Sequence, residues 1–83
     1  MNVRVQMFAR AKELAQRDVV EVCLGDGATV TVADLRRALV EEAPALRSIL
    51  PHVMFAVNME YAGDDLVIPQ GAAVACIPPV SGG

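Results

Sequence analysis

The sequence has few of the side chains on which catalytic and metal sites are built. Its 83 residues include no Trp, one Tyr, two Phe, one His and two Cys. His52 stands in a connecting segment, and no orienting carboxylate or nucleophile can be placed beside it. Cys23 and Cys76 form neither a CxxC pair nor a metal-ligand spacing with the histidine. Two adjacent carboxylates, Asp64-Asp65, fall short of a calcium loop. We therefore expect no catalytic constellation and no metal site.

An excess of positive charge and long apolar runs are also missing. The net charge is −3, from 7 basic and 10 acidic residues, which argues against a nucleic-acid binder and is compatible with a partner whose docking surface is basic. No stretch approaches the roughly 18 apolar residues of a membrane helix. Arg4, Gln6 and Arg10 interrupt what would be the apolar core of a signal peptide. We expect a cytoplasmic protein that binds neither nucleic acid nor membrane.

Aliphatic side chains are abundant instead. Hydrophobic residues make up 54% of the chain, and the mean hydropathy is +0.42. A domain of this size buries only about 60% of its unfolded surface, so its core is small. Because an exposed apolar patch usually marks a contact surface, the composition predicts a protein partner.

The hydrophobic periodicity predicts an α+β fold. Strands are expected at residues 3–7, 19–24, 53–59 and 72–77, with a brief strand at 66–68 and a short helix at 9–16. The run at 53–59 is apolar almost throughout, so we expect both of its faces to be covered. Thr31 is a plausible N-cap of the main helix, supported by Asp34, and Pro44 stops that helix. One helix packed on a four- or five-stranded sheet is the economical arrangement.

Such a sheet leaves its second face to polar residues or to a partner. Alternation along the first strand places Phe8 with Arg4 and Gln6, opposite the buried set that contains Val3 and Val5. Phe8 is therefore expected on the uncovered face.

The last six residues, 78–83, differ from the domain of residues 1–77. Pro78 and Pro79 fix φ and remove two backbone donors, which predicts a stiff extended stem. Gly82 and Gly83 have no side chains, so the tip is slim enough for a narrow tunnel. The only distinctive group there is the Gly83 carboxylate, which becomes an acyl donor once it is converted to a mixed anhydride. Gly-Gly alone is weak evidence, because most chain ends fray.

This ending resembles a known family. Ile77-Pro78-Pro79-Val80-Ser81-Gly82-Gly83 looks like the C-terminus of the small subunit of molybdopterin synthase. The opening VRVQMFARAKEL of residues 3–14 is similar to that family's first strand and short helix. Phe55-Ala56-Val57-Asn58, followed by Tyr61 and Gly71, matches its second half. Gln6 and Cys76 depart from it, since bulkier apolar residues are common there.

The resemblance implies a β-grasp, ubiquitin-like fold with a mixed sheet. In that family an adenylating, sulfurtransferase-type enzyme uses ATP to activate the terminal glycine, and a sulfur donor converts it to a thiocarboxylate. The tail then enters the large subunit, in a heterotetramer, and gives sulfur to cyclic pyranopterin monophosphate to form the dithiolene of molybdopterin. Such a chain binds no cofactor itself and is half of an enzyme.

Carried over to this sequence, Gly83 would bear the adenylate and then the thiocarboxylate, and Gly82 would keep the tip slim. The family positions that contact the large subunit fall on Phe8, Tyr61, Ile77, Pro78, Pro79, Val80 and Ser81.

Three alternatives stay open. A sulfur carrier of the thiamine pathway ends in the same way, although those chains are usually shorter and lack the Pro-Pro stem. A protein modifier would be joined through Gly83 to lysines of its targets. A plain interaction module would have an idle tail.

Overall fold

The computed structural model describes residues 1–25 and 29–79, and residues 26–28 and 80–83 lie outside the described part. Its elements in chain order are β1 (Asn2–Met7), α1 (Ala9–Ala15), β2 (Val19–Cys23), α2 (Val32–Glu42), the 3₁₀ turns η1 (Pro44–Leu46) and η2 (Leu50–His52), β3 (Met54–Val57), β4 (Glu60–Ala62) and β5 (Val74–Ile77).

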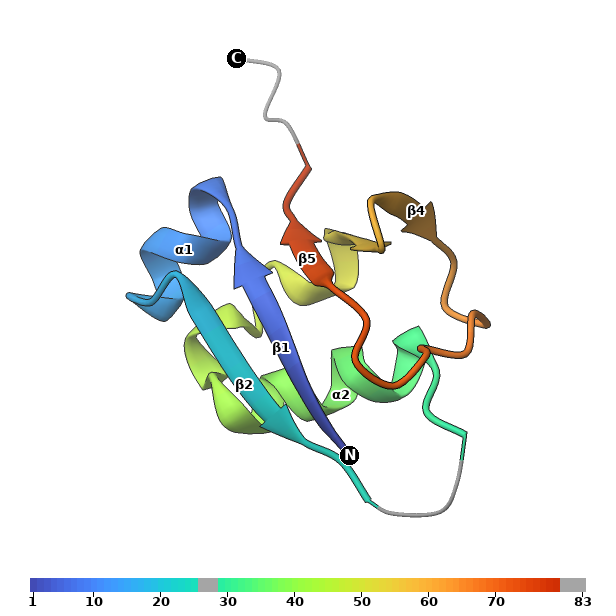
Figure 1. Cartoon of the computed structure of the whole chain (residues 1–83). Helices are drawn as coiled ribbons and strands as arrows, with labels where there is room; N and C mark the ends of the chain where they lie inside the picture. The colour runs from blue at the N-terminus through green and yellow to red at the C-terminus, as the bar shows by residue number, and fades with distance from the viewer. Residues whose placement is uncertain (26–28, 80–83) are drawn as a thin grey trace.

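The described strands form one mixed sheet in the order β2-β1-β5-β3-β4. β1 and β5 are parallel at its centre, and the other neighbours are antiparallel. In Figure 1 the sheet lies in front of α2, so the face toward the viewer is the one that α2 leaves uncovered. This is the β-grasp, ubiquitin-like fold, as predicted.

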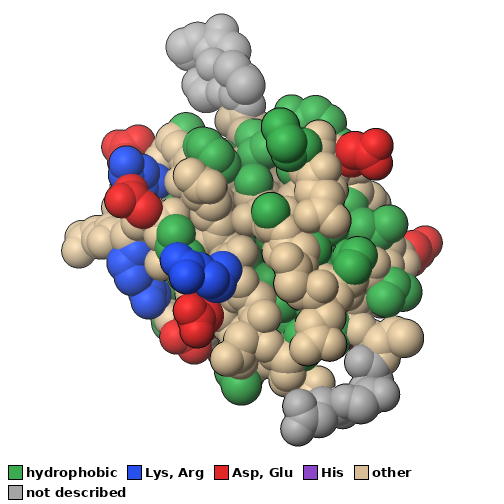
Figure 2. All heavy atoms as spheres, in the orientation of Figure 1, with side chains coloured by type: hydrophobic (Ala, Val, Ile, Leu, Met, Phe, Trp, Pro, Cys, Tyr) green, Lys and Arg blue, Asp and Glu red, His purple; other side chains and the backbone are tan. Residues whose placement is uncertain are grey.

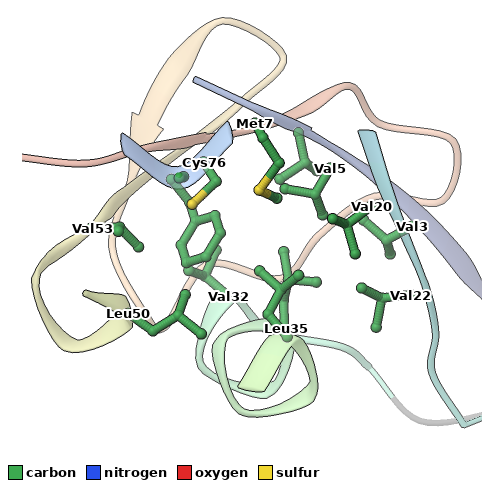
Figure 3. Packing of buried hydrophobic residues seen from close by; sticks show 14 of the residues in the cluster. Val3, Val5, Met7, Val20, Val22, Val32, Leu35, Leu50, Val53 and Cys76 are labelled. Carbon is green, nitrogen blue, oxygen red and sulfur yellow. The ribbon is translucent and has the colours of Figure 1, made fainter. Parts of the chain in front are cut away.

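The core lies between the sheet and α2. Burial alternates along β1, where Val3, Val5 and Met7 are buried while Arg4 and Gln6 are exposed. Figure 3 shows the buried side chains of β1 and β2 gathered against Leu35 of α2. Leu35 is fully buried, and a leucine buried in this way contributes about 1.5–3 kcal/mol to folding. The alternation thus fixes which side chains are left on the second face of the sheet.

The start of α2 is held by the predicted cap. The Thr31 hydroxyl accepts a hydrogen bond from the Asp34 backbone N–H (3.3 Å), and the Thr31 N–H donates to the Asp34 carboxylate (3.0 Å). These bonds from Thr31, the backbone one foremost, hold the pKa of Asp34 below its ordinary value. At the other end Pro44 begins η1 after the helix stops. Both predictions for this helix are confirmed.

The prediction of a single strand at 53–59 is wrong. β3 ends at Val57, and Asn58 and Met59 adopt left-handed φ values of 51° and 71°. Val57 pairs with Glu60 across this two-residue turn, which is the geometry of a type I′ hairpin. The chain therefore reverses into β4, a strand that the continuous apolar run concealed.

Three smaller expectations are also corrected. Met54 is 51% exposed, so β3 is not covered on both faces. The brief strand at 66–68 reduces to one bridge between Val67 and Thr31. The last strand begins at Val74 instead of residue 72, because the preceding residues turn over Gly71, whose φ is 80°.

Candidate docking face and the start of the tail

The sheet face opposite α2, here called the outer face, carries a cross-strand row of side chains. Gln6 of β1 pairs with Ala75 of β5, Ala75 with Ala56 of β3, and Ala56 with Tyr61 of β4. Residues paired across a sheet point to the same side. Tyr61 is 68% exposed, so the predicted contact residue lies free at the β4 edge of this face.

A second group lies at the end of the sheet from which β5 leaves. Met54 pairs with Ile77, and Phe8 follows Met7, which pairs with Cys76 in β5. Phe8 is 42% exposed and contributes to a hollow of the outer face, so the strand parity predicted for it is confirmed. Ile77 is half-buried. Phe8, just past the end of β1, thus forms an apolar patch with Ile77 of β5 and Met54 of β3.

Two exposed residues of this face, Met54 and Met59, were not predicted from the sequence. The assumption of a strand covered on both faces assigned Met54 to the interior, and without the hairpin no surface position could be assigned to Met59. The signal that could have located the turn is Asn58, because asparagine tolerates left-handed φ better than most residues.

Charged side chains lie mainly to one side of the outer face. Arg4 of β1 pairs in register with Glu21 of β2. On α1 and the turn after it, Lys12 and Asp18 form an exposed ion pair at 2.8 Å. Figure 2 shows most charged side chains of this view at the left, with hydrophobic side chains from the upper centre to the right. The outer face is therefore divided into a polar half and an apolar half.

The tail begins inside the apolar half. β5 lies third in the sheet, between β1 and β3, and ends at Ile77. Pro78 is buried and Pro79 is exposed. The predicted site residues Val80, Ser81, Gly82 and Gly83 lie outside the described residues. In Figure 1 the chain leaves the sheet at the end of β5. The strand register places this point next to Phe8 and Met54.

The two cysteines lie in different surroundings. Cys76 is fully buried among the core residues, and burial raises the pKa of its thiol to about 11. Its departure from the family pattern therefore concerns the core and not the outer face. Cys23 is exposed at the end of β2. Only Cys23 can meet a reagent while the protein is folded.

We expect iodoacetamide at neutral pH to label the folded protein once, at Cys23. The thiolate is the reactive form, and Cys76 is both inaccessible and protonated. In denaturant the same reagent should label both cysteines, which intact-mass and peptide mass spectrometry would count. Labelling of Cys76 at the Cys23 rate in the folded protein would contradict its burial.

Other types of site find no support in the described residues. In the ranges 1–25 and 29–79 no three or more His, Cys, Asp and Glu side chains come together as a metal site would require. No helix in the same ranges is long and apolar enough to cross a membrane.

Comparison with known proteins gives a consistent assignment. The model of the ThiS family matches residues 5–83. A molybdopterin synthase sulfur carrier subunit from Chlamydomonas reinhardtii is 38% identical to this chain, and the alignment covers 100% of both proteins. A subunit of the same name from Caenorhabditis briggsae is 36% identical, and the alignment covers 100% of this chain and 99% of that protein. The crystal structure of SAMP1 from Haloferax volcanii, 31% identical, superposes with a TM-score of 0.84 over 100% of both chains. The chain therefore belongs to the ThiS family, together with the molybdopterin synthase sulfur carrier subunits that the sequence resembles.

Proposed function

We propose that this chain is the sulfur carrier subunit of a molybdopterin synthase, acting in the cytoplasm. The observation that carries the proposal is the position of the tail: it leaves β5 beside the exposed apolar group Phe8, Met54 and Ile77. A large subunit that covers this group would hold the base of the tail and direct residues 80–83 into its own active site. The names of relatives at 36–38% identity support the same role.

The chemistry requires only the terminal carboxylate of this chain. An oxygen of Gly83 attacks the α-phosphorus of ATP on an adenylating enzyme, and pyrophosphate leaves. A hydrosulfide ion from the sulfur donor then attacks the acyl carbon, AMP leaves, the sulfur loses its proton, and the chain ends in a thiocarboxylate. Gly82 and Gly83 carry no side chains, so an activating enzyme can close around the acyl group. The chain itself would hold neither ATP nor a cofactor.

Delivery takes place in the large subunit. The thiocarboxylate sulfur bonds to a carbon of cyclic pyranopterin monophosphate while a carbon–oxygen bond at that carbon breaks. Water then cleaves the acyl carbon–sulfur bond of the resulting thioester, which leaves the sulfur on the pterin and releases the Gly83 carboxylate for another cycle. A dithiolene contains two sulfur atoms, so two loaded carriers are consumed for each molybdopterin. We propose a heterotetramer of two small and two large subunits as the assembly, in which this chain is the sulfur donor and the large subunit supplies the catalytic groups.

The test is to load the chain with sulfur and locate the sulfur atom. The protein is incubated with ATP, its adenylating enzyme and a sulfur source, and is then cleaved before Asp65. The fragment 65–83 contains none of the four methionines of the chain, so methionine oxidation cannot be mistaken for an exchange of oxygen for sulfur. Tandem mass spectrometry should place that exchange on Gly83.

The matched control is Cys23→Ser, which removes the only exposed thiol of the described residues. This variant should load as the wild type does. Sulfur found on Cys23, or no sulfur on Gly83 with a competent enzyme, would refute the proposal.

A protein modifier is the second candidate, and the likeness to SAMP1, a small archaeal modifier protein, is the observation that favours it. A modifier would form covalent adducts with other proteins in cells, and these would disappear when Gly83 is deleted. A sulfur carrier would instead copurify non-covalently with a molybdopterin synthase large subunit.

A further inference from the structure

The turn of the β3–β4 hairpin contains a residue that does not suit its backbone conformation. A type I′ turn needs positive φ at both central residues, and glycine is favoured at the second. Here the second position is Met59, with φ 71°. A side chain with a Cβ adopts this region at a cost in energy, so Met59 is less favourable for the turn than glycine would be.

The neighbouring residue, Asn58, does stabilise the fold at this turn. Its side-chain oxygen accepts a hydrogen bond from the Ala73 N–H (3.0 Å), and its own N–H donates to the Ala73 carbonyl (2.7 Å). These bonds tie the hairpin to the segment before β5. Met59 is 95% exposed, so its side chain gives the isolated fold almost no packing in return for the strained backbone.

Met59 does border a groove on the outer face. The groove has a volume of about 180 Å³ and is lined by Gln6, Phe8, Ala56, Met59 and residues 73–75 at the start of β5 and just before it. The three alanines in this set have small side chains, so they leave the middle of the groove unfilled. Phe8 and Met59 provide its large apolar side chains. A cavity of about 150 Å³ holds a benzene molecule, so this space suits one apolar side chain.

We propose that Met59 is a docking residue for the large subunit, and that its side chain and Phe8 enclose one apolar side chain which that subunit inserts into the groove. The inference rests on the proposed function, because the docking partner is the large subunit. It adds the hairpin tip to the contact residues that the sequence resemblance implies. The groove shares Phe8 with the apolar patch of Phe8, Met54 and Ile77, so we assign the groove to the same partner.

The experiment uses Met59→Gly in the full chain. Glycine relieves the backbone at φ 71°, so the melting temperature should stay the same or rise. Loss of the buried methionine contact should weaken binding to the purified large subunit by about 10- to 100-fold in calorimetry. Stability and affinity thus change independently, which a purely structural role of Met59 does not predict.

Two further variants sharpen the test. Met59→Leu keeps an apolar side chain at the same strained position and should bind within about threefold of the wild type. Ala75→Leu fills the groove from its floor, on a half-exposed position of β5, and should weaken binding while the protein remains folded.

Each outcome decides the inference. If Met59→Gly binds as tightly as the wild type, Met59 has no docking role. If Ala75→Leu binds as tightly, no side chain enters the groove. In both of these cases the wild type still binds, so the proposed function stands and the inference alone is overturned. If the wild type itself fails to bind a molybdopterin synthase large subunit, the proposed function falls and takes the inference with it.

Discussion

Phe8→Asp is expected to abolish docking to the large subunit and to leave the fold intact. Phe8 lies in the apolar group from which the tail leaves, so a partner that holds the tail must cover it. A carboxylate there would be buried against apolar surface without a counter-charge, in addition to the loss of the aromatic contact. We expect the dissociation constant to rise by more than about 100-fold.

The fold should tolerate this charge because of where Phe8 lies in the backbone. It is the N-cap residue of α1, with an extended conformation (φ −126°, ψ 150°), and its side chain makes no capping hydrogen bond to the described residues. Aspartate is among the residues preferred at an N-cap. The free energy of unfolding should therefore stay within about 1 kcal/mol of the wild type, with any capping bond acting in the stabilising direction.

The control for the charge is Phe8→Leu, which keeps an apolar side chain and cannot cap. It should retain most of the affinity for the purified large subunit, as measured by calorimetry. The stability of both variants is measured by urea unfolding. Tight binding by Phe8→Asp would show that the large subunit does not cover this part of the outer face.

Phe8 and Met59 share a physical property that separates them from the core. At each position the local backbone favours another residue, a polar cap at Phe8 and a glycine at Met59. Both positions hold large, exposed apolar side chains that border one groove. Residues that oppose local preference without a gain in packing are expected at functional surfaces. The two substitutions therefore test the same hypothesis, that a partner protein binds this face.

Much of this face could be predicted because strand parity is strict. The two-residue period along β1 placed Phe8 opposite Val3 and Val5, and the structure keeps that division. The cap at Thr31 was visible because a capping box has a fixed spacing to Asp34. Local rules of this kind depend on neighbouring residues alone, so the sequence is sufficient for them.

The β3–β4 hairpin could not be predicted in the same way. Its turn is Asn58-Met59, without the glycine that normally marks a two-residue turn, and the apolar run before it continues through Met59. Periodicity alone cannot separate one buried strand from a strand followed by such a turn. The surface positions of Met59 and Tyr61 depend on this reversal, so this part of the candidate site appears only in three dimensions.

The role of Arg36 likewise depends on tertiary structure. In the sequence it belongs to the polar side of the main helix, beside Arg37. In the structure its guanidinium donates to the carbonyl oxygens of Leu50 and Val53, the latter at 2.9 Å, and to the Asp64 carboxylate at 2.8 Å. It also lies over the Phe55 ring, 5.0 Å from the centroid. One side chain of α2 thus holds both the entry to the β3–β4 hairpin and the loop that follows it.

Arg36→Met is therefore expected to lower the free energy of unfolding by about 3 kcal/mol, since it keeps the apolar stem but leaves the Leu50 and Val53 carbonyls without this donor. For a domain of this size that corresponds to a fall in melting temperature of roughly 10–20 °C. The matched control is Arg37→Met on the same helix. Arg37 pairs only with Asp34 among the described residues, in an exposed contact, so its loss should cost less than about 1 kcal/mol.

Urea unfolding measures the stability of the two variants, and binding to the large subunit measures the functional consequence of each substitution. Because Arg36 fixes the hairpin that carries Met54, Met59 and Tyr61, the folded fraction of Arg36→Met should also bind the large subunit more weakly, whereas Arg37→Met should bind as the wild type. Equal stability of the two variants would show that the carbonyls of Leu50 and Val53 find other donors. The outer face would then depend on the hairpin turn itself, and not on the contacts that Arg36 of α2 makes with Leu50, Val53 and Asp64.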